Sequence, residues 1–131
     1  MKATIVFLLM IALATDCSKF SSSKNNPEAF IGKWKLVETL ADPGDGSGKW
    51  LPVSENNANS YVEFTDDGRL VSKTLFIGYD QYQFNVDSTH IILKKSSGNE
   101  TQELNYQLSN RQLTINLQCI EPCGLRFAKV K

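Results

Sequence analysis

The chain has 131 residues, 41% hydrophobic and 21% charged, a composition typical of one ordinary globular domain. Lysine plus arginine and aspartate plus glutamate number 14 each, so the net charge is zero and no basic field exists to gather nucleic acid. The single histidine, His90, excludes a metal site with two histidine ligands and permits a histidine-based catalytic triad at one position only.

The N-terminus has the pattern of an export signal. Met1-Lys2 gives a positive start, and the predominantly apolar run 3–14 is far shorter than the ~20 residues that cross a membrane. Cys17 stands where a lipoprotein would be cleaved and acylated, which predicts a signal peptide over 1–16. A small-x-small sequence also permits ordinary cleavage before Thr15.

Residues 17–26 form a polar, serine-rich run of the kind that tethers a domain flexibly to a surface. The chain has three cysteines, an odd number, and acylation of Cys17 leaves Cys119 and Cys123 to pair. We therefore expect an exported protein of a bacterial envelope, lipid-anchored to the outer membrane through Cys17. The alternative is a soluble exported domain in which Cys17 has no role.

The expected folded domain, residues 27–131, begins with a short helical turn. Asn26 can cap this turn and Pro27 can open it. The turn leads to Gly32, where the backbone must bend closely around a large group, which we expect to be Trp34.

The stretch after Gly32 alternates in residue type. Trp34 and Leu36 point to one side of a predicted strand, and Lys33 and Lys35 point to water. This pattern predicts a first strand with one buried face, ending near residue 40.

A helical turn that leads into Gly-x-Trp on the first strand, followed by about one hundred residues of strands, resembles the lipocalin-like families. The segment 31–37, followed by the glycine-rich segment 42–48, resembles specifically the small lipocalin-like lipoproteins of bacterial envelopes. The resemblance implies an eight-stranded calycin barrel with Gly32 and Trp34 as fold signature. It also implies that a late arginine, here Arg126, stacks on the first-strand tryptophan. From the residues alone, Arg126 could equally face solvent.

The segment 41–49 cannot be regular structure, because it contains a proline and three glycines. By resemblance, this loop lies over the mouth of the barrel as a lid. Asp42 and Asp45 invite comparison with calcium loops, but their spacing does not match, and the alternative is that they cap turns. Trp50 and Leu51 follow as a brief apolar return of the loop.

Alternating apolar and polar residues, interrupted by short polar turns, predict further strands along the rest of the chain. They are expected at 61–64, 69–72, 81–86, 90–94, 103–108, 113–117 and 125–130. With the first strand this gives about eight in up-and-down order, and closure into a single antiparallel barrel would bury the apolar face and remove both edges. A two-sheet sandwich is the structural alternative.

Cys119 and Cys123 lie between the last two predicted strands, where a hairpin can bring them to the separation that a disulfide prefers. We predict a structural disulfide. Free thiols or a redox or metal pair are the alternatives.

The expected inward set contains several aromatic residues. It consists of Trp34, Leu36, Val62, Phe64, Leu70, Tyr82, Phe84, Val86, Ile91, Leu93, Leu104, Tyr106, Leu108, Leu113, Ile115, Leu117, Leu125 and Phe127. Trp34, Tyr82, Phe84 and Tyr106 are the candidate ligand-binding residues, with the tyrosine hydroxyls orienting a small apolar molecule. In the competing interpretation these side chains fill the lumen.

Two functions follow from these alternatives. The first is an envelope lipoprotein that binds a small hydrophobic ligand in or at the mouth of the barrel. The second is a filled barrel that acts as a protein-interaction module, an assembly factor or inhibitor, through its loops and an apolar patch at Trp50 and Leu51. Neither needs a cofactor or metal. We predict no enzyme, because His90 is expected to face outward and no serine or cysteine has an evident base beside it.

Overall fold

The computed structural model describes residues 27–131. The predicted signal peptide (1–16), the tether (17–26) with Cys17 and the Asn26 cap lie outside the described residues. Within the described part of the chain, no helix is long and apolar enough to cross a membrane. The elements are α1 (Pro27–Phe30), β1 (Gly32–Ala41), β2 (Lys49–Pro52), the 3-10 turn η1 (Glu55–Asn57), β3 (Tyr61–Phe64), β4 (Leu70–Ser72), β5 (Gln81–Phe84), β6 (His90–Lys94), β7 (Thr101–Ser109), β8 (Gln112–Asn116) and β9 (Cys123–Lys129).

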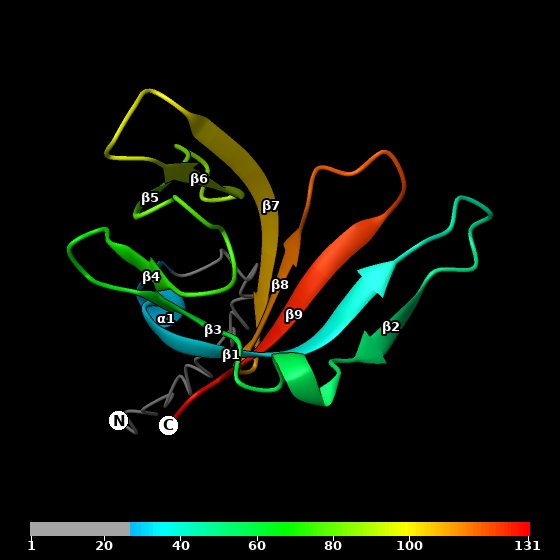
Figure 1. Cartoon of the computed structure of the whole chain (residues 1–131). Coiled ribbons are helices and arrows are strands. Elements are labelled where there is room, and N and C mark those ends of the chain that lie inside the picture. Colours follow the sequence, from blue (N-terminus) through cyan, green and yellow to red (C-terminus); the bar gives the residue numbers. More distant parts are fainter. Residues whose placement is uncertain (1–26) are drawn as a thin grey trace, which may run out of the picture.

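The strands follow one another around the molecule as antiparallel neighbours (Figure 1). The sheet has the order β4-β3-β1-β9-β8-β7-β6-β5. Its two outer strands, β4 and β5, are joined by a bridge between Arg69 and Gln81 and by a 2.9 Å hydrogen bond from Leu70 N–H to Asp80 O. The result is a nearly closed antiparallel barrel of eight strands, which confirms the predicted all-β barrel with a short N-terminal helical turn.

The ninth strand, β2, pairs only with β1. It runs beside the second half of β1, from Glu38 to Ala41, whereas β3 pairs with the first half, from Gly32 to Lys35. Trp50 and Leu51, predicted to be a brief apolar return of the preceding loop, lie instead on β2, which extends the sheet along the second half of β1.

Burial follows the predicted alternation, because one face of each strand points into the barrel. The buried apolar side chains are Phe30, Trp34, Leu36, Val62, Phe64, Leu70, Tyr82, Ile91, Leu93, Leu104, Tyr106, Leu113, Ile115 and Phe127. Phe30 was not predicted, because it lies on the helical turn rather than on an alternating strand. Val86, predicted to point inward, is fully exposed, because β5 ends at Phe84 and Val86 falls in the following turn.

A bulge divides β1 into two halves. Leu36 lies opposite Phe127 of β9, but Glu38 lies opposite Arg126, so Val37 is an additional residue in the ladder. One additional residue reverses the alternation of side chains beyond it. Glu38 therefore shares the outer face of the barrel with Arg126.

Candidate functional site

The helical turn α1 closes one end of the barrel, together with the turns 65–69 and 85–89. We call this the closed end. Trp34 is fully buried and its Nε1–H donates a 2.7 Å hydrogen bond to Phe30 O, which fixes the turn on the first strand. Gly32 has φ +126°, and a Cβ there would lie 3.2 Å from Lys129 Cε. Glycine is therefore required at this position, as predicted, although the group it accommodates is Lys129 and not Trp34.

The cation that lies over Trp34 is Lys129. Its Nζ is 5.1 Å from the centre of the indole ring and donates a 2.8 Å hydrogen bond to Ala29 O. The register explains this, because Lys129 is opposite Trp34 in the ladder between β1 and β9. The predicted pairing of Arg126 with Trp34 is wrong, because Arg126 faces outward between inward Leu125 and Phe127.

Arg126 instead holds β2 to the outside of the barrel. Its guanidinium lies 4.0 Å from the ring centre of Trp50 and is paired with the Glu38 carboxylate. A Cβ on Gly124 would be 2.8 Å from Trp50 Cη2, so the indole also lies directly on this glycine. The Trp50 side chain is thus half-buried and packs against the barrel wall. Of the predicted apolar patch, only Leu51, which is 61% exposed, can contact a partner.

The structure brings Tyr82, Phe84 and Tyr106 together around Phe30. The ring centre of Phe30 lies 6.1, 5.2 and 5.1 Å from theirs, and 4.3 Å from that of Phe64. These distances are those of rings in direct, mostly tilted or edge-on contact. The side chain missed by sequence reasoning therefore lies at the centre of the predicted ligand-binding residues.

Both tyrosine hydroxyls are engaged by turns of the closed end. Tyr82 Oη–H donates to Thr65 O (2.6 Å) and Tyr106 Oη–H donates to Ser88 O (2.8 Å). Burial raises the pKa of Tyr106 to about 12 and also raises the pKa of Tyr82. The two hydroxyls act as neutral donors to the backbone in this arrangement.

At the other end of the barrel, the connection from β4 to β5 packs on the core. Leu75, Phe76 and Tyr79 are partly buried against it. Phe76 has φ +52°, a conformation uncommon for a bulky residue. The sequence did not predict this covering segment, since 73–80 has no alternation.

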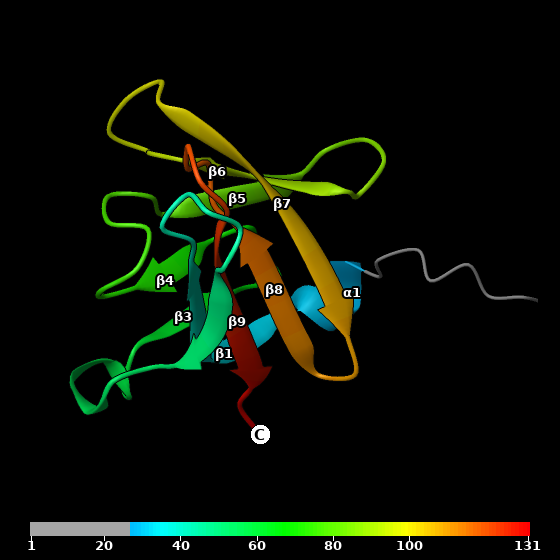
Figure 2. The ribbon, with the colours of Figure 1, turned by 90° about the vertical axis from the view of Figure 1, so that its right-hand side faces the viewer.

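Loop 41–49, predicted to lie over the mouth of the barrel as a lid, contacts the loop between β8 and β9 instead. Asp42 N–H donates a 3.1 Å hydrogen bond to Pro122 O, and a Cβ on Gly44 would lie 3.1 Å from the Glu121 carboxylate, so this loop rests on the β8–β9 loop. Figures 1 and 2 both show these two loops side by side. We call residues 42–48 and 117–122 the double-loop tip.

One carboxylate organises the first of these loops. Asp42 Oδ1 accepts hydrogen bonds from Gly44 N–H (2.8 Å) and Gly46 N–H (3.2 Å), and Oδ2 accepts one from Gly48 N–H (3.0 Å). These bonds, chiefly those from Gly44 and Gly48, hold the pKa of Asp42 below its ordinary value. The aspartate therefore caps the turn, which was the alternative to a calcium loop. Among residues 27–131, histidine, cysteine, aspartate and glutamate form no group of three or more that could hold a metal ion.

The second loop is closed by the predicted disulfide. Cys119 and Cys123 are bonded with their Cα atoms 6.0 Å apart. Leu117 N–H donates a 3.2 Å hydrogen bond to Cys123 O just inside the bridge. Ile120, within the closed loop, is fully exposed. The tip therefore presents an aliphatic side chain on a covalently restrained loop.

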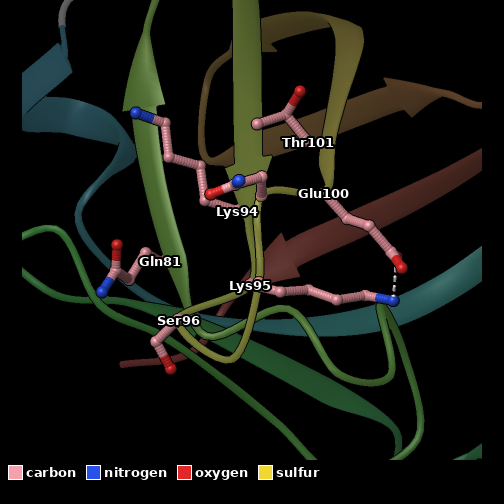
Figure 3. Close-up of a pocket in the computed structure, with 8 residues that line it drawn as sticks. Gln81, Lys94, Lys95, Ser96, Glu100 and Thr101 are labelled. Atoms are coloured by element: carbon pink, nitrogen blue, oxygen red, sulfur yellow. Dashed lines mark hydrogen bonds and ion pairs between the residues drawn. The ribbon is translucent and has the colours of Figure 1, made fainter.

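A polar pocket of about 380 Å³ lies on the surface beside the start of β5, the end of β6 and the start of β7 (Figure 3). In Figure 3 the Lys95 side chain extends to Glu100, with which it forms an ion pair, and Lys94 points away from it. Lys94 Nζ donates to Gln83 Oε1 (2.7 Å). The charged ends of this pocket are thus engaged with neighbouring side chains and do not converge on its centre.

Comparisons with protein-family models, with curated proteins and with solved structures found no match to this chain. The lipocalin-like resemblance stays a prediction. Lys129 and Phe30 are the two residues of the closed end that sequence reasoning missed. Knowledge of the register of β9 against β1 would have shown that Lys129 lies opposite Trp34. For Phe30, the available signal was an apolar residue at the end of a capped helical turn.

Proposed function

We propose that this protein is a lipocalin-like envelope lipoprotein, anchored through Cys17, that acts as a protein-interaction module through the double-loop tip. The main support is the packing of the interior. The residues that would line a ligand site pack on Phe30, and their hydroxyls donate to Thr65 O and Ser88 O. A ligand inside would have to displace these contacts.

The tip has the properties of a preformed recognition surface. The disulfide, the hydrogen bond from Asp42 to Pro122 and the three bonds to the Asp42 carboxylate restrain its two loops. A restrained loop loses little conformational entropy on binding, so an exposed aliphatic side chain on it contributes more to affinity. Ile120, with Leu51 on the adjoining strand β2, offers such side chains to an apolar depression on a partner protein.

Site-specific photo-cross-linking in the native envelope tests this proposal. A photoactivatable residue replaces Ile120 in one variant and Val86 in a matched control, since both positions are fully exposed aliphatic residues but lie on different turns. We expect one discrete protein adduct from position 120 and none from position 86. An adduct from position 86 alone, or equal adducts from both, would refute the tip as the binding surface.

Native mass spectrometry of the purified protein, before and after organic extraction, tests the competing function. We expect the mass of the protein without a bound small molecule. A discrete extractable mass that disappears in Tyr106→Phe would instead support a small hydrophobic ligand in the barrel.

A further inference from the structure

A second surface lies near the start of β1, far from the tip. It surrounds a pocket of about 360 Å³ lined by Lys33, Lys35, Asn59, Tyr61 and Val130, which we call the basic groove. Lys33 and Lys35 point outward from β1, and Tyr61 lies opposite Lys35 on β3. Val130 N–H donates a 2.9 Å hydrogen bond to Lys33 O, which places the end of the chain along the groove.

The groove combines positive charge with apolar surface. Lys33 Nζ lies 3.8 Å from the ring centre of Tyr61, and Val130 is 42% exposed. Within residues 27–131, neither Lys33 nor Lys35 forms an ion pair. One carboxylate, Glu63, is opposite Lys33 on this outer face and offsets part of the charge.

Two further cations extend the positive surface toward β9. Arg111 is exposed, and its Nη2–H donates to Lys129 O (3.5 Å). Lys129 N–H in turn donates to Arg111 O (3.0 Å), so the two residues are held side by side. Around the start of β1 and the end of β9, the four cations Lys33, Lys35, Arg111 and Lys129 outnumber the two carboxylates Glu28 and Glu63, so this surface carries a net positive charge.

The position of the groove along the chain relates it to the predicted lipid anchor. Lys33 follows α1 directly, and α1 is where the described barrel joins residues 1–26. Ten tether residues, 17–26, span at most ~33–36 Å, so a lipid at Cys17 would hold the start of β1 within that distance of the membrane. The tip begins after Ala41, about 26 Å further along β1 at ~3.3 Å per residue.

We infer that the basic groove docks on an anionic lipid surface. The ammonium groups of Lys33 and Lys35 would contact lipid phosphates, while Tyr61 and Val130 reach the boundary between headgroups and acyl chains. Such docking directs the double-loop tip away from the membrane, toward soluble or envelope-exposed partners. The inference goes beyond the proposed function and does not require acylation of Cys17.

Vesicle binding tests the inference on the exported chain carrying Cys17→Ser, which removes the proposed anchor. The probes are vesicles of phosphatidylcholine alone and vesicles of phosphatidylcholine mixed with phosphatidylglycerol. We expect binding only to the mixed vesicles, weakening as salt is added. At about 1 kcal/mol for each lysine, Lys33→Gln with Lys35→Gln should weaken binding about 30-fold.

The matched control is Lys49→Gln with Lys94→Gln, two lysines that lie at the start of β2 and at the end of β6, away from the start of β1. This pair changes the net charge equally and should leave vesicle binding within about twofold of the parent, since a charge more than a Debye length from the lipid is screened. Denaturant midpoints equal to the parent's would show that both pairs fold.

Three results would overturn the inference: absence of binding, equal binding to both kinds of vesicle, or equal losses in the two double variants. Cross-linking from position 35 to an acidic protein in place of lipid would also overturn it and assign the groove to a protein partner. None of these results bears on cross-linking from position 120, so the proposed function is tested separately.

Discussion

At the closed end of the barrel, Phe30 and Trp34 are fully buried and four further aromatic rings pack around Phe30, whereas at the double-loop tip Ile120 is fully exposed. The tip is ordered by different means, namely a disulfide, a carboxylate that accepts three backbone hydrogen bonds and one hydrogen bond between loops. Burial stabilises the whole fold, while local restraints fix the shape of one surface. Substitutions at the closed end should therefore reduce the stability of the whole fold, whereas substitutions at the tip should have smaller effects that are mainly local.

The largest expected effect is at the closed end. Phe30→Ala should lower the free energy of unfolding by about 3–5 kcal/mol, because it removes the ring at the centre of the aromatic cluster and leaves a cavity. Urea denaturation followed by circular dichroism measures this loss. Val86→Ala is the control, expected within about 0.5 kcal/mol because Val86 is fully exposed. A small loss in Phe30→Ala would mean that α1 does not close the barrel.

Removal of the disulfide should have an intermediate effect. Cys119→Ser with Cys123→Ser should cost about 2 kcal/mol, since the closed loop is very short and the constraint on the unfolded chain is correspondingly small. Urea denaturation under non-reducing conditions measures it. We also expect weaker cross-linking from position 120. Unchanged cross-linking would show that the bridge does not shape the tip.

A smaller effect is expected for the hydroxyl of Tyr106. Tyr106→Phe should cost about 1 kcal/mol, the net contribution of one hydrogen bond. The pKa of Tyr106 is raised to about 12, so its stabilising contribution is complete below about pH 10 and is lost as the pH rises through 12. Ultraviolet absorbance titration should show a step near pH 12 that the variant lacks. A parent titration without this step would contradict the burial of the hydroxyl.

The smallest effect on global stability is expected at Asp42, where the response should be local. The pKa of Asp42 is lowered, so its contribution is present above the ordinary carboxyl pKa near 4 and is lost as the pH falls through the lower folded value. Amide resonances of Gly44, Gly46 and Gly48 should therefore shift together at acid pH, before the barrel unfolds. In Asp42→Asn they should be displaced already at neutral pH. If these amide resonances changed only when the whole protein unfolds, the tip and the closed end would belong to one cooperative unit, contrary to this prediction.

Individual residues show where sequence reasoning succeeded. Alternation placed Trp34, Tyr82 and Phe127 inside the barrel, since a strand presents its side chains to opposite faces in turn. The spacing of Cys119 and Cys123 within one loop was enough to predict their bond. These features depend on neighbours in the chain.

The partners of Trp34 and Arg126 could not be predicted in this way. Each is set by the register of β9 against β1, and the bulge at Val37 changes that register within one strand. A shift of one residue moves every following side chain to the other face of the sheet. The lipocalin-like resemblance therefore suggested a cation over Trp34 but assigned it to Arg126 instead of Lys129.

The sequence by itself determined eight of the nine strands, the inward face of most of them, the helical turn before Gly32 and the disulfide, because periodicity and turn chemistry act over a few residues. Only the tertiary structure decided that Phe30 fills the space between Tyr82 and Tyr106, and that loop 42–48 rests on the disulfide loop. These contacts join segments far apart in the chain, and their geometry depends on how the barrel closes rather than on any local pattern.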